Sequence, residues 1–190
     1  MTTLLIPLRS YANAHAATFD ADRSAGFVNA WGNSFPAEEM PFGRVLLCGG
    51  IPFAVEPKGE GEADHIEALG QIIEIGSAVV TRAIAILCFA ELGDQRLPLT
   101  LIGRFGEKRR LEVTIPYWLT SGEEAAKPST WRATHLHYAA GYELNHLRPA
   151  LHAIAVRLPA PFSAVSVELG VNPLVHMLAL TLVDREVDRG

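Results

Sequence analysis

Two histidines, His135 and His137, have the residue type and spacing in this chain that point most directly to chemistry. Side chains two positions apart on a strand lie on the same face, so both imidazoles could bind one metal ion. Glu143 and His146 follow within a few residues and could supply further ligands. The alternative needs no metal, because histidines also line protein surfaces or hydrogen-bond to loops. The sequence leaves both interpretations open.

A second group of polar side chains, Asn33, Ser34 and Glu38, lies in the stretch 26–41, which has turn-forming residues at both ends. These side chains could hydrogen-bond to the hydroxyl groups of a ligand. Asn and Ser also support tight turns, and a glutamate can accept hydrogen bonds from backbone donors. A purely local role is therefore the competing interpretation.

The three tryptophans are candidates for stacking on a sugar ring, whose C–H face packs well on an aromatic plane. Trp118 follows a strong strand pattern, so we expect it to pack in the core or at its rim. Trp31 and Trp131 lie in loop-like surroundings, where ligand stacking and packing are equally open. The ligand-binding residues that the sequence predicts are Trp31, Asn33, Glu38, Trp131, His135 and His137.

Other kinds of catalytic site find little support. Cys48 and Cys88 each lie in an apolar run, so buried free thiols are expected, although spacing alone leaves a disulfide open. There is no Gly-x-Ser-x-Gly motif and no glycine-rich phosphate loop followed by a helix. Paired carboxylates for glycoside hydrolysis stay possible, since several glutamates lie between residues 38 and 67, but nothing selects a pair.

The composition limits the class of protein. The chain has 190 residues, a formal net charge of −5 and 49% apolar residues, and its mean hydropathy is positive. These values exclude a disordered chain and argue against non-specific nucleic-acid binding. Apolar runs end well before the roughly 20 residues of a membrane helix, and the first residues lack the basic segment of a signal peptide. We therefore expect a cytoplasmic protein that binds neither nucleic acid nor membranes.

Short strands are the elements that must position these residues. The run 78–90 could be a strand or a short helix, and its β-branched residues favour a strand. We expect loops at 120–130 and 141–149 and a basic hairpin tip at 108–110. Many short strands with Gly and Pro between them predict an all-β, antiparallel β-sandwich or barrel. It forms one domain over 1–190, with a frayed tail at 184–190. The predicted strands are 4–8, 45–48, 51–55, 65–75, 78–90, 97–105, 110–115, 135–138, 150–158, 164–169 and 174–183.

One stretch resembles a known family. The residues 32–41, Gly-Asn-Ser-Phe-Pro-Ala-Glu-Glu-Met-Pro, are followed at 50–53 by Gly-Ile-Pro-Phe. This pattern resembles the N-terminal part of the galactose-binding-like (jelly-roll) β-sandwich domains attached to many bacterial glycoside hydrolases. Weaker matches extend from residue 3 to about residue 183. The resemblance implies a jelly-roll fold and binding of a sugar or another polar small molecule, but no activity, because fold and function separate readily.

Three functional hypotheses follow. The first is binding of a carbohydrate or glycosylated compound without catalysis and without a cofactor. The second is a metal-dependent enzyme of small-molecule metabolism with a divalent ion on His135, His137, Glu143 and His146, since the spacing His-x-His-x5-Glu is similar to the first metal motif of cupins. The third is a structural subunit that docks on a partner enzyme or forms a homodimer, to which the apolar run 78–90 gives weight.

Overall fold

The computed structural model describes residues 3–121, 128–141 and 143–184, and within these ranges the chain is built from β-strands without an α-helix. A single turn of 3₁₀-helix, η1 (Arg9–Tyr11), follows the first strand, and the described part of the chain contains no helix with the length and apolarity to span a membrane. The all-β prediction is therefore confirmed. The strands are β1 (Thr3–Ile6), β2 (Ala17–Thr18), β3 (Asn33–Pro36), β4 (Arg44–Cys48), β5 (Ile51–Val55), β6 (Ile66–Leu69), β7 (Ile72–Ala90), β8 (Gln95–Gly103), β9 (Lys108–Ile115), β10 (Leu119–Ser121), β11 (Thr130–Arg132), β12 (Leu136–Tyr138), β13 (Glu143–Leu144), β14 (Leu147–Leu169) and β15 (Val171–Val183).

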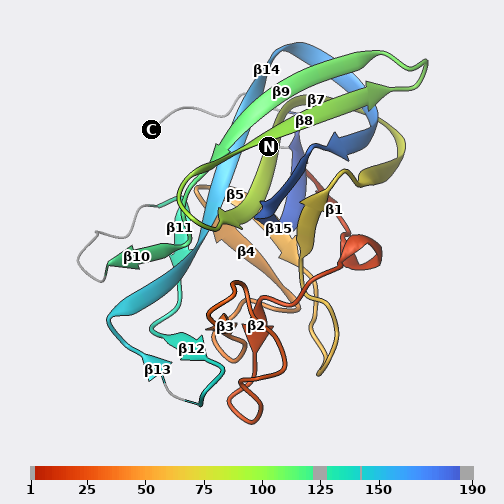
Figure 1. Ribbon diagram of the computed structural model, residues 1–190. Coiled ribbons are helices and arrows are strands. Elements are labelled where there is room, and N and C mark those ends of the chain that lie inside the picture. Colours follow the sequence, from red (N-terminus) through yellow and green to blue (C-terminus); the bar gives the residue numbers. More distant parts are fainter. Residues whose placement is uncertain (1–2, 122–127, 142, 185–190) are drawn as a thin grey trace.

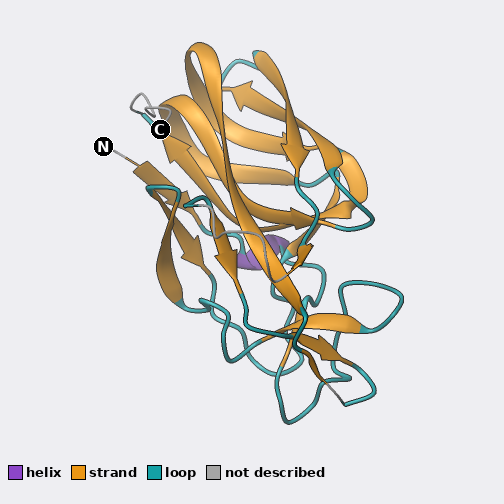
Figure 2. Cartoon of the chain, turned by 90° about the vertical axis from the view of Figure 1, so that its left-hand side faces the viewer, coloured by secondary structure: helices purple, strands orange, loops and turns teal. Residues whose placement is uncertain are grey.

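Most strands belong to one large sheet with the order β1-β15-β7-β14-β8-β9; β6 pairs with β15, and β10 and β11 pair with β14. A small sheet, β13-β12-β3-β2, and the hairpin β4-β5 complete the sandwich. The long strands curve over the upper part of the molecule, and the small sheet lies at the lower end (Figure 1). Loops gather at that end, as the view turned by 90° also shows (Figure 2). We call it the loop end.

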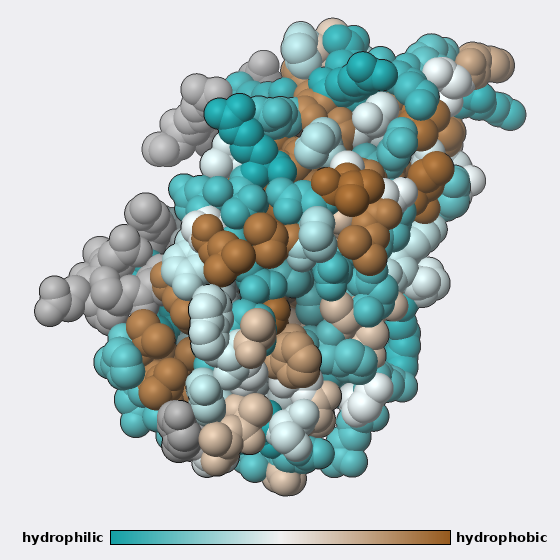
Figure 3. All heavy atoms as spheres, viewed as in Figure 1, coloured by the Kyte–Doolittle hydropathy of each residue, from teal (hydrophilic) through white to brown (hydrophobic). Residues whose placement is uncertain are grey.

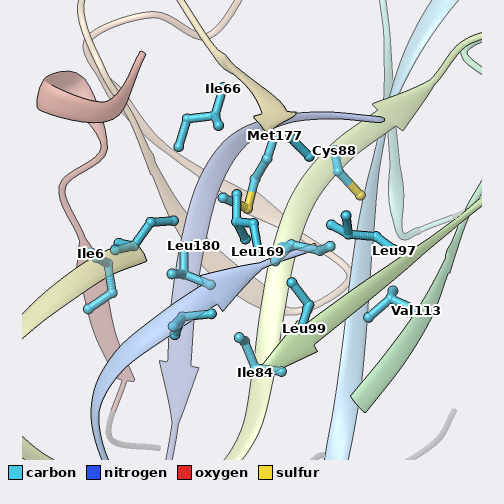
Figure 4. Close-up of a cluster of buried hydrophobic side chains, with 14 of the residues drawn as sticks. Ile6, Ile66, Ile84, Cys88, Leu97, Leu99, Val113, Leu169, Met177 and Leu180 are labelled. Atoms are coloured by element: carbon cyan, nitrogen blue, oxygen red, sulfur yellow. The ribbon is translucent and has the colours of Figure 1, made fainter. Parts of the chain in front are cut away.

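Strand β7 is buried on both faces in its second half. Its even-numbered residues from Ile84 to Ala90 belong to one apolar cluster, and its odd-numbered residues from Ala83 to Phe89 belong to another. Because side chains alternate across a strand, each face of β7 has its own core. In the first cluster, Ile84, Leu99 and Leu180 come together from three strands (Figure 4). Burial on two faces explains the unbroken apolar run in the sequence and confirms the strand prediction.

The hairpin β4-β5 turns at Gly49 and Gly50, as the sequence predicts. Their φ angles are +60° and +74°, a left-handed conformation that glycine adopts without strain and that a two-residue hairpin turn requires. The turn sets Cys48 opposite Ile51. Phe53 on the second strand is fully buried in the cluster that contains Phe89. The hairpin therefore covers one face of the large sheet.

Some local predictions are wrong. The strands expected at 150–158 and 164–169 form one strand, β14, although Pro159 and Pro161 lie between them. Both prolines fall at a register shift between Arg157 and Phe162, where the pairing with β7 is interrupted and a missing backbone donor costs little. Proline therefore marks an irregularity inside β14 and not its end.

Two predicted loops also contain strands. The basic residues 108–110 lie at the start of β9, and the turn before them is formed by residues 104–107. The expected loop at 141–149 contains β13 and the first residues of β14. The expected frayed tail beyond Asp184 and most of the loop expected at 120–130 lie outside the described residues. On the face seen in Figure 3, apolar residues form separate patches between polar ones.

Candidate functional site

The loop end joins segments that are far apart in the sequence. Strand β12 pairs with β3, so that His137 lies opposite Ser34 and Tyr138 opposite Asn33. Strand β2 runs parallel to β3 on the other side, with Thr18 opposite Pro36. Through this small sheet, the loops that follow β2 and β3 lie beside the two histidines of the 135–137 stretch.

His137 is completely buried at this junction. Its Nδ1 lies 3.1 Å from the hydroxyl of Thr18, which lies 2.6 Å from the hydroxyl of Ser34. Its Nε2 lies 3.2 Å from Oδ1 of Asp20, but the two atoms are not aligned as a hydrogen bond, and Nε2 has no hydrogen-bond partner among the described residues. Burial, followed by the positive charge of Arg23, lowers the pKa of His137. The ring is therefore neutral at pH 7.

His135 also has polar neighbours at its Nδ1 atom, which come from Glu39 and Thr134. Its Nδ1 lies 3.1 Å from Oε1 of Glu39 and 3.0 Å from the hydroxyl of Thr134. Glu39 is itself held by the backbone N–H of Thr134 at 2.7 Å and by the Thr134 hydroxyl. The Nε2 of His135 is buried and has no hydrogen-bond partner in the described part of the chain. Both histidines thus have a fixed Nδ1 and an unpaired Nε2.

Asp20 comes to this site from the loop after β2, with a side chain that stays largely exposed. Arg23 donates to its Oδ1 at 2.7 Å and to Oε1 of Glu143 at 2.8 Å. The hydrogen bond from Arg23 lowers the pKa of Asp20. The backbone N–H of Asp20 donates to Oε1 of Glu38 at 2.8 Å. The carboxylate is therefore ionised, and both the side chain and the backbone of Asp20 have a hydrogen-bond partner.

Asp20, His135 and His137 each offer one ligand atom, and these atoms all lie within 4.8 Å of one another. The two imidazole centroids are 5.1 Å apart. Two histidines and a carboxylate form a donor set that divalent transition metals accept. We call these three residues the histidine–aspartate group.

An open depression of about 510 Å³ lies at the same end. It is lined by the aromatic residues Phe27, Trp31 and Tyr138 together with small residues of the two loops. Phe27 is 60% exposed and Trp31 is 59% exposed, which is unusual for large aromatic side chains. Strand β12 contributes to both features, because His137 belongs to the histidine–aspartate group and Tyr138 lines the depression. We call this surface the aromatic depression.

The residues predicted from the sequence have different surroundings. Asn33 is buried in β3, and Glu38 is exposed beside the Asp20 loop. Trp131 packs against Phe35 at a centroid distance of 6.5 Å, within the second core cluster and away from Trp31. His135 and His137 lie together, and Trp31 lies on the aromatic depression.

The expected further metal ligands have other surroundings. Glu143 pairs with Arg23, and His146 is exposed; neither belongs to the histidine–aspartate group. Both cysteines are buried and free, as expected, and burial raises the pKa of both thiols. A thiolate nucleophile is therefore not available at neutral pH.

Sequence reasoning did not select Asp20, Arg23, Glu39 or Thr18 as functional. Only Glu39 had a local signal, because it lies in the proline-bounded stretch 26–41. Thr18 and His137, which are in contact, are 119 positions apart. No short-range pattern links residues at such a separation.

A second histidine pair, His65 and His176, lies outside the histidine–aspartate group and differs in its bonding. Asp64 Oδ1 lies 2.7 Å from His65 Nδ1, His65 Nε2 lies 2.9 Å from His176 Nδ1, and His176 Nε2 lies 3.1 Å from Oε1 of Glu91. His176 also stacks on Phe89 with a centroid distance of 4.6 Å. Every ring nitrogen has a partner, so we assign this chain of four groups a structural role.

These features define a β-sandwich protein with a candidate ligand site on the loops at one end. Over residues 3–186 the chain matches the model of the AziU2-like beta-sandwich domain family, and it belongs to that family. No curated protein matches the chain. The family supports the β-sandwich part of the resemblance described from the sequence and does not name a ligand.

Proposed function

We propose that the protein binds a saccharide, or another ring compound that carries hydroxyl groups, at the aromatic depression. The observation that carries this proposal is the exposure of Phe27 and Trp31 around one open concave surface. Exposed aromatic patches on a concave surface are typical of binding sites. Sugar rings present a C–H face that packs on an aromatic plane, while their hydroxyl groups stay in water or bond to polar groups.

The turn that presents Trp31 is held in place before any ligand binds. Oδ1 of Asn29 accepts hydrogen bonds from the backbone N–H groups of Trp31 and Asn33, both at 3.2 Å. Gly32 has a φ angle of +75°, and a Cβ at this position would lie 2.9 Å from the Cβ of Ala139. Only glycine allows this close approach between the turn and the residues after β12. A preformed site loses less entropy on binding, which supports a role in recognition.

The likeness of the stretch 32–41 to galactose-binding-like domains supports the same ligand class. In this proposal the protein is a binding protein, and the hydroxyl groups of the ligand are bonded by polar groups at the rim of the depression. Ser24 lines this rim and is exposed.

The test is a saccharide array followed by calorimetric titration of each hit, a measurement that is equally available for the wild type and for a variant without Trp31. We expect affinity of about millimolar or tighter for at least one saccharide. Trp31→Ala should weaken binding about tenfold, because it removes the stacking surface. Phe105→Ala is the matched control, since Phe105 is 88% exposed in the turn between β8 and β9 and lines no part of the depression. If no saccharide binds, or if both variants bind equally well, the proposal is wrong.

A further inference from the structure

We propose that the histidine–aspartate group binds a divalent first-row transition-metal ion through Nε2 of His135, Nε2 of His137 and the carboxylate of Asp20. This goes beyond saccharide binding and does not depend on it. The ligand set differs from the one expected from the sequence, because Asp20 takes the place of Glu143 and His146.

The hydrogen bonds at Nδ1 leave Nε2 of each ring as the nitrogen that can bind a metal. The hydroxyl of Thr134 donates to Glu39, so it accepts from Nδ1 of His135, which therefore has the proton. The hydroxyl of Thr18 can donate to Ser34 and accept from Nδ1 of His137. In a neutral imidazole with a proton on Nδ1, Nε2 carries a lone pair. Both Nε2 atoms are therefore free to act as metal ligands. In known metal sites, a hydrogen bond at the other ring nitrogen commonly orients a histidine ligand in this way.

Without a cation this arrangement is unfavourable. The Nε2 of His137 is fully buried and lies 3.2 Å from Oδ1 of Asp20 without a hydrogen bond among the described residues. The Nε2 of His135 is also buried and has no hydrogen-bond partner among the residues that the structure describes. A buried polar atom without a partner is a defect that folded proteins seldom keep without a functional reason. One cation would give both Nε2 atoms a partner and would also pair with the carboxylate of Asp20.

The surrounding charge favours a dication. The carboxylates of Asp20, Glu38, Glu39 and Glu143 lie in this network, and Arg23 is the cation that pairs with two of them. Among the contacts named here between described residues, four carboxylates and one guanidinium leave an excess of three negative charges. A bound dication would reduce this excess, whereas a bound anion would increase it.

The size and type of the ligand set restrict the metal. A tetrahedral ion holds its ligand atoms about 2.1 Å away and about 3.4 Å from one another. The three atoms, now within 4.8 Å, would have to move closer, and the exposed loop that carries Asp20 can move more easily than β12. Two imidazoles favour zinc, iron, cobalt, nickel or copper over calcium or magnesium, which prefer oxygen ligands. Three protein ligands leave further coordination positions for water or a ligand.

The experiment is a titration of the chelator-treated protein with zinc, followed by cobalt titration with visible absorption spectra. We expect one zinc ion per chain and a cobalt spectrum of tetrahedral or five-coordinate type. Asp20→Asn and His135→Gln should each weaken zinc binding at least about tenfold. Asp20 is largely exposed, so the first variant should keep the fold, and circular dichroism checks this. His146→Gln is the control, because His146 is exposed and lies outside the group.

Two results would overturn the proposal. One is that the wild-type protein binds no zinc. The other is that both variants bind zinc as tightly as the wild type, which would assign the ion to adventitious sites. The titrations contain no saccharide, so failure of metal binding and failure of saccharide binding are separate results.

Discussion

The two histidine pairs of this protein contain the same residue types in opposite bonding states. In the pair His65 and His176, all four ring nitrogens bond to protein groups, from Asp64 at one end to Glu91 at the other. In the pair His135 and His137, each Nδ1 has a partner, but neither Nε2 has a hydrogen bond within the described residues. The first pair is complete without a ligand, and the second is not.

Whether the ring nitrogens have partners distinguishes a structural histidine pair from a binding pair better than the burial of the rings does. His137 and His65 are both buried, so their exposure does not distinguish them. A buried polar atom that lacks a partner costs about 1–3 kcal/mol, and a satisfied one costs little. Folded proteins contain few buried polar atoms without a partner. When two such atoms belong to neighbouring rings beside a carboxylate, a ligand that offsets the cost is the simplest explanation.

The largest expected effect comes from removing the carboxylate of the complete pair. Asp64 bonds to His65, pairs with Lys58 at 2.9 Å and accepts from the backbone N–H groups of Ala16 and Ala17. Asp64→Ala would leave these buried donors without an acceptor and should lower the free energy of unfolding by about 3–5 kcal/mol. Urea denaturation measures the change. Asp20→Ala at the incomplete pair should have little effect on it, and equal losses in the two variants would contradict the comparison.

A pH titration of stability is the next largest test. Burial alone would raise the pKa of Asp64, but the hydrogen bond and charge of His65, the charge of Lys58 and the N–H of Ala16 outweigh it and lower the pKa from 3.8 to about 2. The unfolded chain therefore takes up this proton first as the pH falls. Above about pH 4 the ionised Asp64 makes its full contribution to the free energy of unfolding. As the pH falls towards 2, this contribution of about 2 kcal/mol is lost.

The control for this titration comes from the other pair. Asp64→Asn should lose the acid-dependent part of the unfolding free energy, as urea denaturation between pH 5 and about pH 2 would measure. Asp20→Asn should keep it, because the pKa of Asp20 is lowered by Arg23 at an exposed position where solvent screens the interaction. An unchanged pH profile in Asp64→Asn would show that another group is responsible.

Local sequence patterns predicted the parts of the fold that depend on neighbours in the chain. The turn at Gly49 and Gly50 needs only two adjacent residues with positive φ, and the buried strand β7 needs only its own apolar, β-branched run. The His135 and His137 rings lie close together, as expected from the sequence, but only His137 is on β12, and His135 lies in the bend before it. By contrast, the single strand β14 could not be predicted, because its prolines fall at a register shift that depends on β7.

The partners of the two histidines could not be predicted for a related reason. Thr18, Asp20 and Glu39 reach them only because β2, β3 and β12 form one small sheet, and pairing between distant strands leaves no local signal. The sequence pattern did suggest Glu143, which is near in the chain and opposite His137 in the pairing of β12 with β13. Its carboxylate bonds to Arg23, so proximity in the chain did not determine the contact.

The smallest expected effect tests whether the outer partner of each pair has the role assigned to it. In the incomplete pair, Glu39 accepts from the Thr134 hydroxyl that bonds to Nδ1 of His135, and it lies 3.1 Å from this nitrogen. In the complete pair, Glu91 bonds to Nε2 of His176. Glu39→Gln keeps the size of the side chain but lets an amide N–H face Nδ1, so the proton of His135 can shift to Nε2 and block the metal ligand. Zinc titration should show affinity weaker by about tenfold. Glu91→Gln is the matched change at the other pair and should leave zinc affinity unchanged while lowering thermal stability. Equal zinc affinities in the two variants would mean that Glu39 does not position a ligand, and the distinction between the pairs would then depend on the unpaired Nε2 atoms alone.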